Sequence, residues 1–104
     1  RDVASYFRQY DLLICPCVPV PAHPHGVAEI TIAGKSHRAR TALRDTIPWD
    51  LTGSPAISVP FGFSSDGLPI GVQIVGRHFD ENTVIKAASA LEEMSDTVAK
   101  RPSV

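Results

Sequence analysis

The sequence has little net charge and no long apolar segment. Its formal net charge is −1, from 10 Lys and Arg residues against 11 Asp and Glu residues. A nucleic-acid surface needs clustered Lys and Arg, so this balance argues against a nucleic-acid partner. The longest uncharged apolar run, residues 12–22, is too short for a membrane span of about 20 residues and is interrupted by prolines. We therefore expect no transmembrane helix and no membrane partner.

Cysteine is also scarce. Two cysteines in an otherwise ordinary composition indicate a reducing compartment, and hence a cytoplasmic location. Cys15 and Cys17, with His23 and His25, provide four zinc-type ligands. Their spacing is poor for a structural zinc site, and Pro16 stiffens the first pair, so we expect no metal. A disulfide between the two cysteines would be strained at so short a loop.

Length and composition fit one globular unit. The 104 residues, 43% of them hydrophobic, correspond to about one small domain. The sequence shows no internal repeat and no low-complexity tract. We expect residues 1–104 to form a single unit. The first residue is Arg1 rather than methionine, which indicates truncation or processing of a longer chain.

The first half of the chain alternates helical and extended patterns. Aromatic residues at helical spacing predict a helix over residues 2–9. A short apolar run over residues 12–15 predicts a strand buried on both faces, as in a layered α/β sheet. Repeated prolines make residues 17–25 an extended loop beside a strand end, where ligands often bind. We further expect a hairpin over residues 29–38, a helix over residues 39–46 that ends before Pro48, and a loop over residues 49–55.

The second half predicts an antiparallel hairpin followed by a helix. Residues 56–63 and 68–75 are rich in β-branched and aromatic residues, and Ser64, Ser65, Asp66 and Gly67 supply the turn between them. Asp80 or Asn82 is expected to cap the helix by accepting backbone N–H groups, with Lys100 and Arg101 at the other end. An inward apolar stripe is predicted for this helix. It consists of Val84, Ala87, Ala88, Leu91, Met94 and Val98.

None of the serines is predicted to be a nucleophile. Ser64 and Ser65 precede an Asp-Gly pair between two strands, which favours a turn role. Ser58 alternates along a strand and is expected to be a packed or hydrogen-bonded core hydroxyl. His78 and Asp80 could complete a triad with a serine, but their position between strand and helix favours capping and a solvated surface. We assign no catalytic residue to this chain.

Polar residues near the hairpin are the candidates for binding. Gln73 lies in an apolar strand, where an unpaired amide costs roughly 1–3 kcal/mol; a network within the protein is favoured over a substrate contact. Thr46, Trp49 and Asp50 precede a strand, and loop residues placed by a rigid sheet are good candidates for a pocket wall. We predict these three as substrate-binding residues, with core packing as the other interpretation of Trp49.

Four motifs in order resemble the C-terminal part of the amidase-signature hydrolases. They are Thr46-Ile47-Pro48, Asp50-Leu51-Thr52-Gly53, Pro55 to Pro60 and Pro69 to Gly76. The resemblance implies the C-terminal part of an α/β fold with a mixed β-sheet flanked by helices. It also implies hydrolysis of carboxamide C–N bonds by a Ser, Ser, Lys triad that lies upstream of this chain, without metal or organic cofactor. The chain alone is expected to be inactive and to supply part of the wall for a small amide substrate.

Two positions depart from the family pattern. Asp50 stands where asparagine is common. Leu43 stands where A subunits of tRNA-dependent amidotransferases tend to carry an acidic residue that helps hold glutamine. Losing a carboxylate partner for the α-ammonium group should weaken glutamine binding, so a general amidase is preferred and the amidotransferase subunit is the alternative.

A different class of function also fits the sequence. An isolated part of a larger sheet leaves strand edges exposed. The chain could then be a non-catalytic module that binds a partner, or another copy of itself, through those edges. A small zinc-binding domain is the third possibility.

Overall fold

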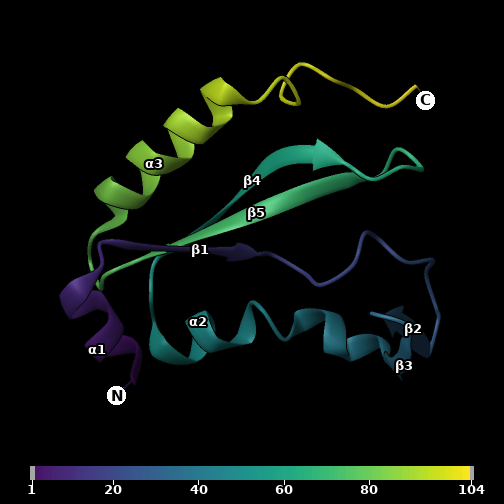
Figure 1. Cartoon of the computed structure of the whole chain (residues 1–104), viewed down its shortest axis with the longest axis horizontal. Coiled ribbons are helices and arrows are strands. Elements are labelled where there is room, and N and C mark those ends of the chain that lie inside the picture. Colours follow the sequence, from purple (N-terminus) through teal and green to yellow (C-terminus); the bar gives the residue numbers. More distant parts are fainter. Residues whose placement is uncertain (1, 104) are drawn as a thin grey trace.

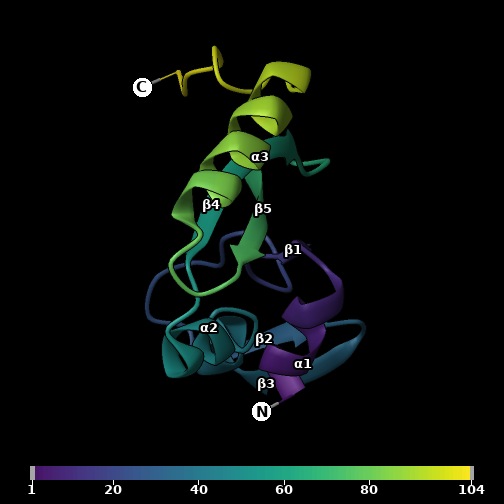
Figure 2. The ribbon, with the colours of Figure 1, turned by 90° about the vertical axis from the view of Figure 1, so that its left-hand side faces the viewer.

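The computed structural model describes residues 2–103 as a three-stranded sheet with helices on both sides (Figures 1 and 2). Helix α3 covers one face, and α1 and α2 lie on the other side together with a separate two-stranded hairpin. The elements in chain order are α1 (Asp2–Gln9), β1 (Leu12–Pro16), β2 (Glu29–Ile32), β3 (Lys35–Arg38), the 3-10 helix η1 (Ala39–Leu43), α2 (Ile47–Thr52), β4 (Ala56–Phe63), β5 (Pro69–Gly76) and α3 (Glu81–Met94). The expected α/β architecture is confirmed.

The main sheet has the strand order β1-β5-β4, and both pairs are antiparallel. Ile74 of β5 lies opposite Ile14 of β1 and Ile57 of β4. A β-bulge interrupts β4 between Pro60 and Gly62. The separate hairpin pairs β2 with β3. Both hairpins predicted from the sequence are therefore confirmed.

The turn between β4 and β5 is built from the serine cluster. The Ser64 N–H donates to the Leu68 carbonyl at 2.8 Å, and the Leu68 N–H donates to Ser64 Oγ at 3.0 Å. Gly67 has a φ of +84°, in the left-handed region that favours glycine. Ser64 thus acts in the turn, as predicted.

The main core lies between α3 and the β4–β5 hairpin. Its buried members are Val59, Ile74, Val84 and Ala88, with Leu12, Ile57, Ala87 and Leu91 packed against them. Glycine at position 76 allows α3 to pack closely against β5, because a Cβ atom there would lie 2.4 Å from Val84 Cγ2. A smaller cluster, formed by Ile30, Ile32 and Ala42, joins the β2–β3 hairpin to η1.

The predicted inward stripe of α3 is correct only in its first four members. Met94 is 79% exposed and Val98 is 40% exposed. The helix ends at Met94 because Ser95 takes extended backbone angles, so Lys100 and Arg101 lie beyond it.

The predicted capping of α3 is also wrong in its form. Asp80 occupies the N-cap position, but its side chain makes no capping bond to a backbone N–H. Its carboxylate instead accepts a hydrogen bond from the Thr83 hydroxyl at 2.7 Å.

Strand β1 is not buried on both faces. Among residues 2–103 it pairs only with β5, so it forms an edge of the sheet, and Ile14 is 62% exposed. Ser58 is likewise exposed rather than in the core, and its hydroxyl contacts the Cys17 thiol at 3.0 Å.

Residues 47–52 form helix α2, whereas the sequence predicted a loop over residues 49–55. Proline in the first helical turn is favourable, because its missing N–H has no partner there in any case. Gly53 ends the helix in the left-handed conformation, with a φ of 67°. The preceding segment, predicted as a helix over residues 39–46, is the short 3-10 helix η1.

Candidate functional site

Helix α2 positions the three residues predicted to bind substrate. Thr46 is the N-cap residue, and its hydroxyl donates to the Leu43 carbonyl at 2.9 Å. Trp49 is half-buried and Asp50 is exposed to solvent. Thr46 thus ties α2 to the end of η1, while the Asp50 carboxylate remains accessible.

A backbone carbonyl that sequence reasoning missed connects this helix to the sheet. The Asp45 carbonyl accepts hydrogen bonds from Trp49 Nε1 and from Gln73 Nε2, both at 2.9 Å. The Gln73 amide also lies 3.4 Å from Cys15 Sγ and 3.5 Å from the Pro16 carbonyl. Gln73 is 6% exposed, so its role in a network within the protein is confirmed. The sequence pattern could not predict the contact between Gln73 and Asp45, because the acceptor is a backbone carbonyl 28 residues away. We call the two hydrogen bonds to the Asp45 carbonyl the Asp45 junction.

A cavity of about 490 Å³ lies between the proline-rich loop and η1. Its walls include Val18, Val20 and Ala22 from the loop, and Leu43 from η1. Leu43 is 53% exposed and Val18 is 42% exposed. These two side chains make this part of the cavity wall apolar, and its lining includes none of Thr46, Trp49 and Asp50. The loop therefore lines a cavity, and ligand binding beside it stays a prediction.

Histidine and cysteine side chains near the site are held by local contacts. His78 Nε2 lies 2.7 Å from the Thr52 carbonyl, and His23 Nδ1 lies 3.1 Å from the Pro24 carbonyl. Cys15 and Cys17 are free thiols. Within residues 2–103, no group of three or more His, Cys, Asp and Glu side chains is placed to hold a metal ion.

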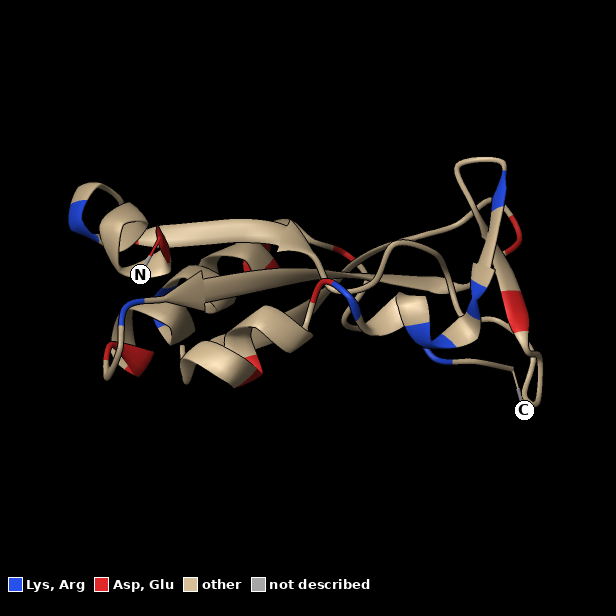
Figure 3. Ribbon diagram, turned by 90° about the horizontal axis from the view of Figure 1, so that it is seen from below, with Lys and Arg blue, Asp and Glu red and all other residues tan. Residues whose placement is uncertain are grey.

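Basic and acidic positions both occur along the length of the molecule (Figure 3). Of the helices in the described part of the chain, none combines the length and apolarity needed to cross a membrane.

The fold is shared with enzymes of known structure. A protein described as amidase superposes with a TM-score of 0.85 at 28% identity, over 90% of this chain and 22% of its own. The 6-aminohexanoate cyclic dimer hydrolase superposes with a TM-score of 0.82 at 34% identity, over 97% of this chain and 23% of its own. The glutamyl-tRNA(Gln) amidotransferase A subunit from Thermotoga maritima superposes with a TM-score of 0.70 at 38% identity, over 91% of this chain and 20% of its own.

Sequence comparison agrees with the fold. The amidase family model matches residues 1–85, and the chain belongs to this family. Curated relatives include the glutamyl-tRNA(Gln) amidotransferase A subunits of Geobacillus stearothermophilus, 46% identical over 102 residues, and of Halalkalibacterium halodurans, 45% identical over 104 residues. These matches cover 98% and 100% of this chain and 20% of each relative, so the chain spans about one-fifth of their length.

Proposed function

We propose that this chain is the C-terminal part of an enzyme that hydrolyses carboxamide C–N bonds and that carries its catalytic residues upstream. The observation that supports this most strongly is the family match over residues 1–85, together with the fold shared with an amidase at a TM-score of 0.85. A serine hydroxyl attacks the amide carbonyl, a second serine and a lysine relay the proton to the leaving amine, and backbone N–H groups hold the oxyanion. Water then releases the carboxylate. The chain alone is inactive under this proposal, and no metal or organic cofactor takes part.

The contribution of this segment to the enzyme is to shape the substrate site. Thr46, Trp49 and Asp50 lie on or next to a helix that is anchored to the sheet through the Asp45 carbonyl. A rigid scaffold beneath polar and aromatic groups is a common way to build a specificity wall. The cavity beside Leu43, which none of these three residues lines, is proposed as a continuation of this wall.

A glutamine-dependent amidotransferase A subunit is the second candidate. It is favoured by the curated relatives that carry this name at up to 46% identity. Against it, Leu43, which lines the cavity, stands at the position where the resemblance implies a carboxylate partner for the α-ammonium group of glutamine. We therefore prefer a general amidase acting on a small amide. The third candidate, a non-catalytic module, is supported by the open edge of β1.

Sequencing the coding DNA ahead of Arg1, followed by expression of the complete reading frame, tests the proposal. We expect an extension with a Gly-Gly-Ser-Ser-Gly-like loop and an earlier lysine, and a protein that releases ammonia from a simple carboxamide such as benzamide. Alanine in place of the nucleophilic serine should abolish the release and serves as control. Release from glutamine alone would favour the amidotransferase subunit, and a start codon directly ahead of Arg1 would favour the non-catalytic module.

A cytoplasmic location is part of the same proposal. It is supported by the two free thiols, Cys15 and Cys17, since such thiols are typical of a reducing compartment.

A further inference from the structure

Phe79, in the connection between β5 and α3, combines a strained backbone with a solvated ring. Its φ is +63°, in the left-handed region that glycine and asparagine adopt readily and that bulky residues avoid. The Asp80 N–H donates to the Arg77 carbonyl at 3.1 Å and closes the turn around it. The Phe79 side chain is 94% exposed. Packing within the described residues therefore compensates neither the strain nor the exposure of the ring.

The two residues before Phe79 are held by neighbouring elements. Arg77 Nε donates to the Phe7 carbonyl of α1 at 2.8 Å. His78 Nε2 lies 2.7 Å from the Thr52 carbonyl at the end of α2. These contacts fix the backbone that leads into the left-handed residue, so the Phe79 ring is presented to solvent from a rigid support.

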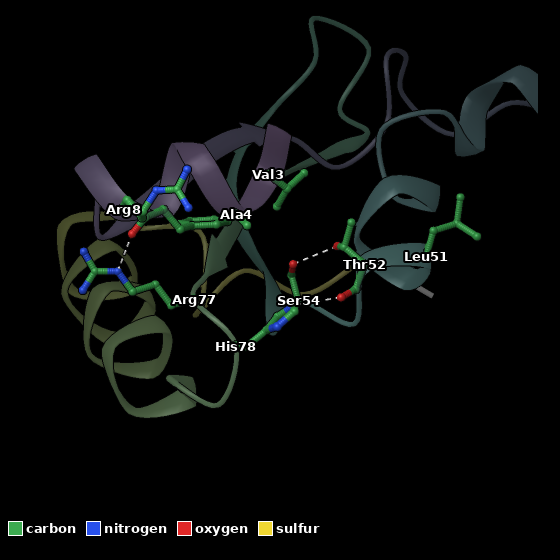
Figure 4. A pocket seen from close by; sticks show the side chains of 9 residues that line it. Val3, Ala4, Arg8, Leu51, Thr52, Ser54, Arg77 and His78 are labelled. Atoms are coloured by element: carbon green, nitrogen blue, oxygen red, sulfur yellow. Dashed lines mark hydrogen bonds between the residues drawn. The ribbon is translucent and has the colours of Figure 1, made fainter. Parts of the chain in front are cut away.

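A cavity of about 530 Å³ lies beside this connection, between α1, the end of α2 and the residues after β5 (Figure 4). Its lining includes the apolar residues Val3 and Ala4 of α1 and Leu51 of α2, and Leu51 is 82% exposed. His78 also lines the cavity, and its ring centroid is 6.4 Å from that of Phe79. We call this cavity together with the Phe79 side chain the Phe79 surface.

The position of α1 indicates what covers the Phe79 surface in a longer protein. The chain spans about one-fifth of the length of its curated relatives. Under the proposed function, the rest of the enzyme precedes α1. Val3 and Ala4, in the first turn of α1, line the cavity, so a preceding segment enters the molecule beside the Phe79 surface.

We propose that the preceding part of the same polypeptide packs on the Phe79 surface, with Phe79 as the aromatic anchor of that contact. This inference rests on the proposed function, because it requires a longer enzyme. Anchors of this kind are large aromatic side chains that fill a pocket of the partner and lose their contact with water. Burial of the ring and of Leu51 compensates for the left-handed backbone, which accounts for phenylalanine where asparagine or glycine would be less strained.

Thermal unfolding of Phe79→Asn tests the anchor in two proteins, the 104-residue chain and the complete reading frame. Asparagine tolerates the left-handed region, so the Tm of the 104-residue chain should stay the same or rise. The Tm of the complete protein should fall by about 3 °C or more, because the buried ring is lost. Met94→Asn, at a 79% exposed residue at the other end of α3, is the matched control. It should change the Tm of the complete protein by less than about 1 °C.

Phe79→Leu keeps an apolar side chain and should lower the Tm of the complete protein less than Phe79→Asn does. It provides the comparison if the complete Phe79→Asn protein does not fold. The same Tm change for Phe79→Asn in both proteins, or equal losses for Phe79→Asn and Met94→Asn in the complete protein, would overturn the proposal. A reading frame that begins directly ahead of Arg1 would also overturn it, because no preceding segment would exist.

Two further measurements separate this inference from its alternatives. Light scattering of the 104-residue chain should give the same mass with and without Phe79→Asn. Loss of an oligomer in the variant would assign the surface to a second copy of the chain instead. Ammonia release from benzamide is measured on the same complete proteins. Absence of hydrolysis would contradict the proposed function, whereas the Tm comparison still decides whether Phe79 is an anchor.

Discussion

At the scale of single residues, the buried amide of Gln73 has the most consequential contacts. It joins β5 to the segment before α2 through the Asp45 carbonyl, and the same carbonyl accepts the Trp49 indole N–H. The sequence indicated that Gln73 needs partners but could not identify them. Alternation along a strand shows which residues are buried and not which distant backbone atom lies opposite.

Gln73→Leu should lower the free energy of unfolding by about 1–3 kcal/mol, because the partly buried hydrogen bond from the Gln73 amide to the Asp45 carbonyl is lost. Urea denaturation monitored by circular dichroism measures this change. Asp50→Asn, at an exposed position, is the matched control and should change stability by less than about 0.5 kcal/mol. Equal stability of the two variants would show that the amide is dispensable.

Trp49→Ala, made in the complete enzyme, should change the ratio of kcat/KM between a bulky and a small amide more than it changes stability. The expected cause is loss of an aromatic wall beside the substrate, with one indole hydrogen bond worth about 1 kcal/mol lost as well. Trp49→Phe keeps the ring and should preserve the ratio. A large loss of stability with an unchanged ratio would assign Trp49 to packing alone.

At the scale of elements, the regular hairpins and helices were predictable and α2 was not. The β4–β5 hairpin has strong β-branched patterning and explicit turn residues, which are local signals. For α2, Pro48 was interpreted as the end of the preceding helix, whereas the structure has it in the first turn of the next. The fixed φ of proline is compatible with both interpretations. Gly53 distinguishes them, because its left-handed conformation ends a helix that begins before Pro48.

The packing of α3 on β5 depends on the absence of a side chain at position 76. Gly76→Ala should lower the free energy of unfolding by about 1–3 kcal/mol, since its Cβ would overlap Val84 in a well-packed core. Gly62→Ala is the control, because a Cβ there meets nothing within 4 Å. In a Val84→Ala background the cost of Gly76→Ala should shrink. An unchanged cost in that background would place the strain elsewhere.

At the scale of the whole molecule, the candidate site depends on contacts between distant segments. The cavity beside Leu43 forms only where the proline-rich loop reaches η1, which lies later in the chain beyond the β2–β3 hairpin. Sequence motifs therefore pointed to the region around Thr46 and Trp49, while the apolar wall and the Asp45 junction required the structure. The roles of Thr46, Trp49 and Asp50 in binding stay predictions.

The two sheet edges differ in how well they are covered. On β4, the Thr97 hydroxyl donates to the Pro60 carbonyl at 3.1 Å, and Ser95 Oγ lies 3.5 Å from the Phe61 carbonyl. On β1, the Tyr6 hydroxyl donates to the Leu12 carbonyl at 3.1 Å at one end of the strand, whereas Ile14 in its middle is 62% exposed. An open apolar edge is a template for pairing with another chain.

We therefore expect the isolated chain to self-associate through β1, as multi-angle light scattering over a concentration series would detect. Ile14→Lys should shift the population toward monomer, because a charge on an edge strand opposes pairing. Ile85→Lys, at an exposed position on α3, should not. A monomer at all concentrations would contradict this expectation.

The junction at Asp45 has a consequence for how this protein can change over time. Both hydrogen bonds there end on the backbone carbonyl, while the side chain lies 3.7 Å from Arg44 in an ion pair near the surface. Any residue at position 45 that keeps the local backbone conformation would preserve these two hydrogen bonds. Position 45 can therefore vary in charge and size next to the proposed substrate wall while the scaffold is retained, which gives evolution or a designer a place to alter specificity at little cost in stability.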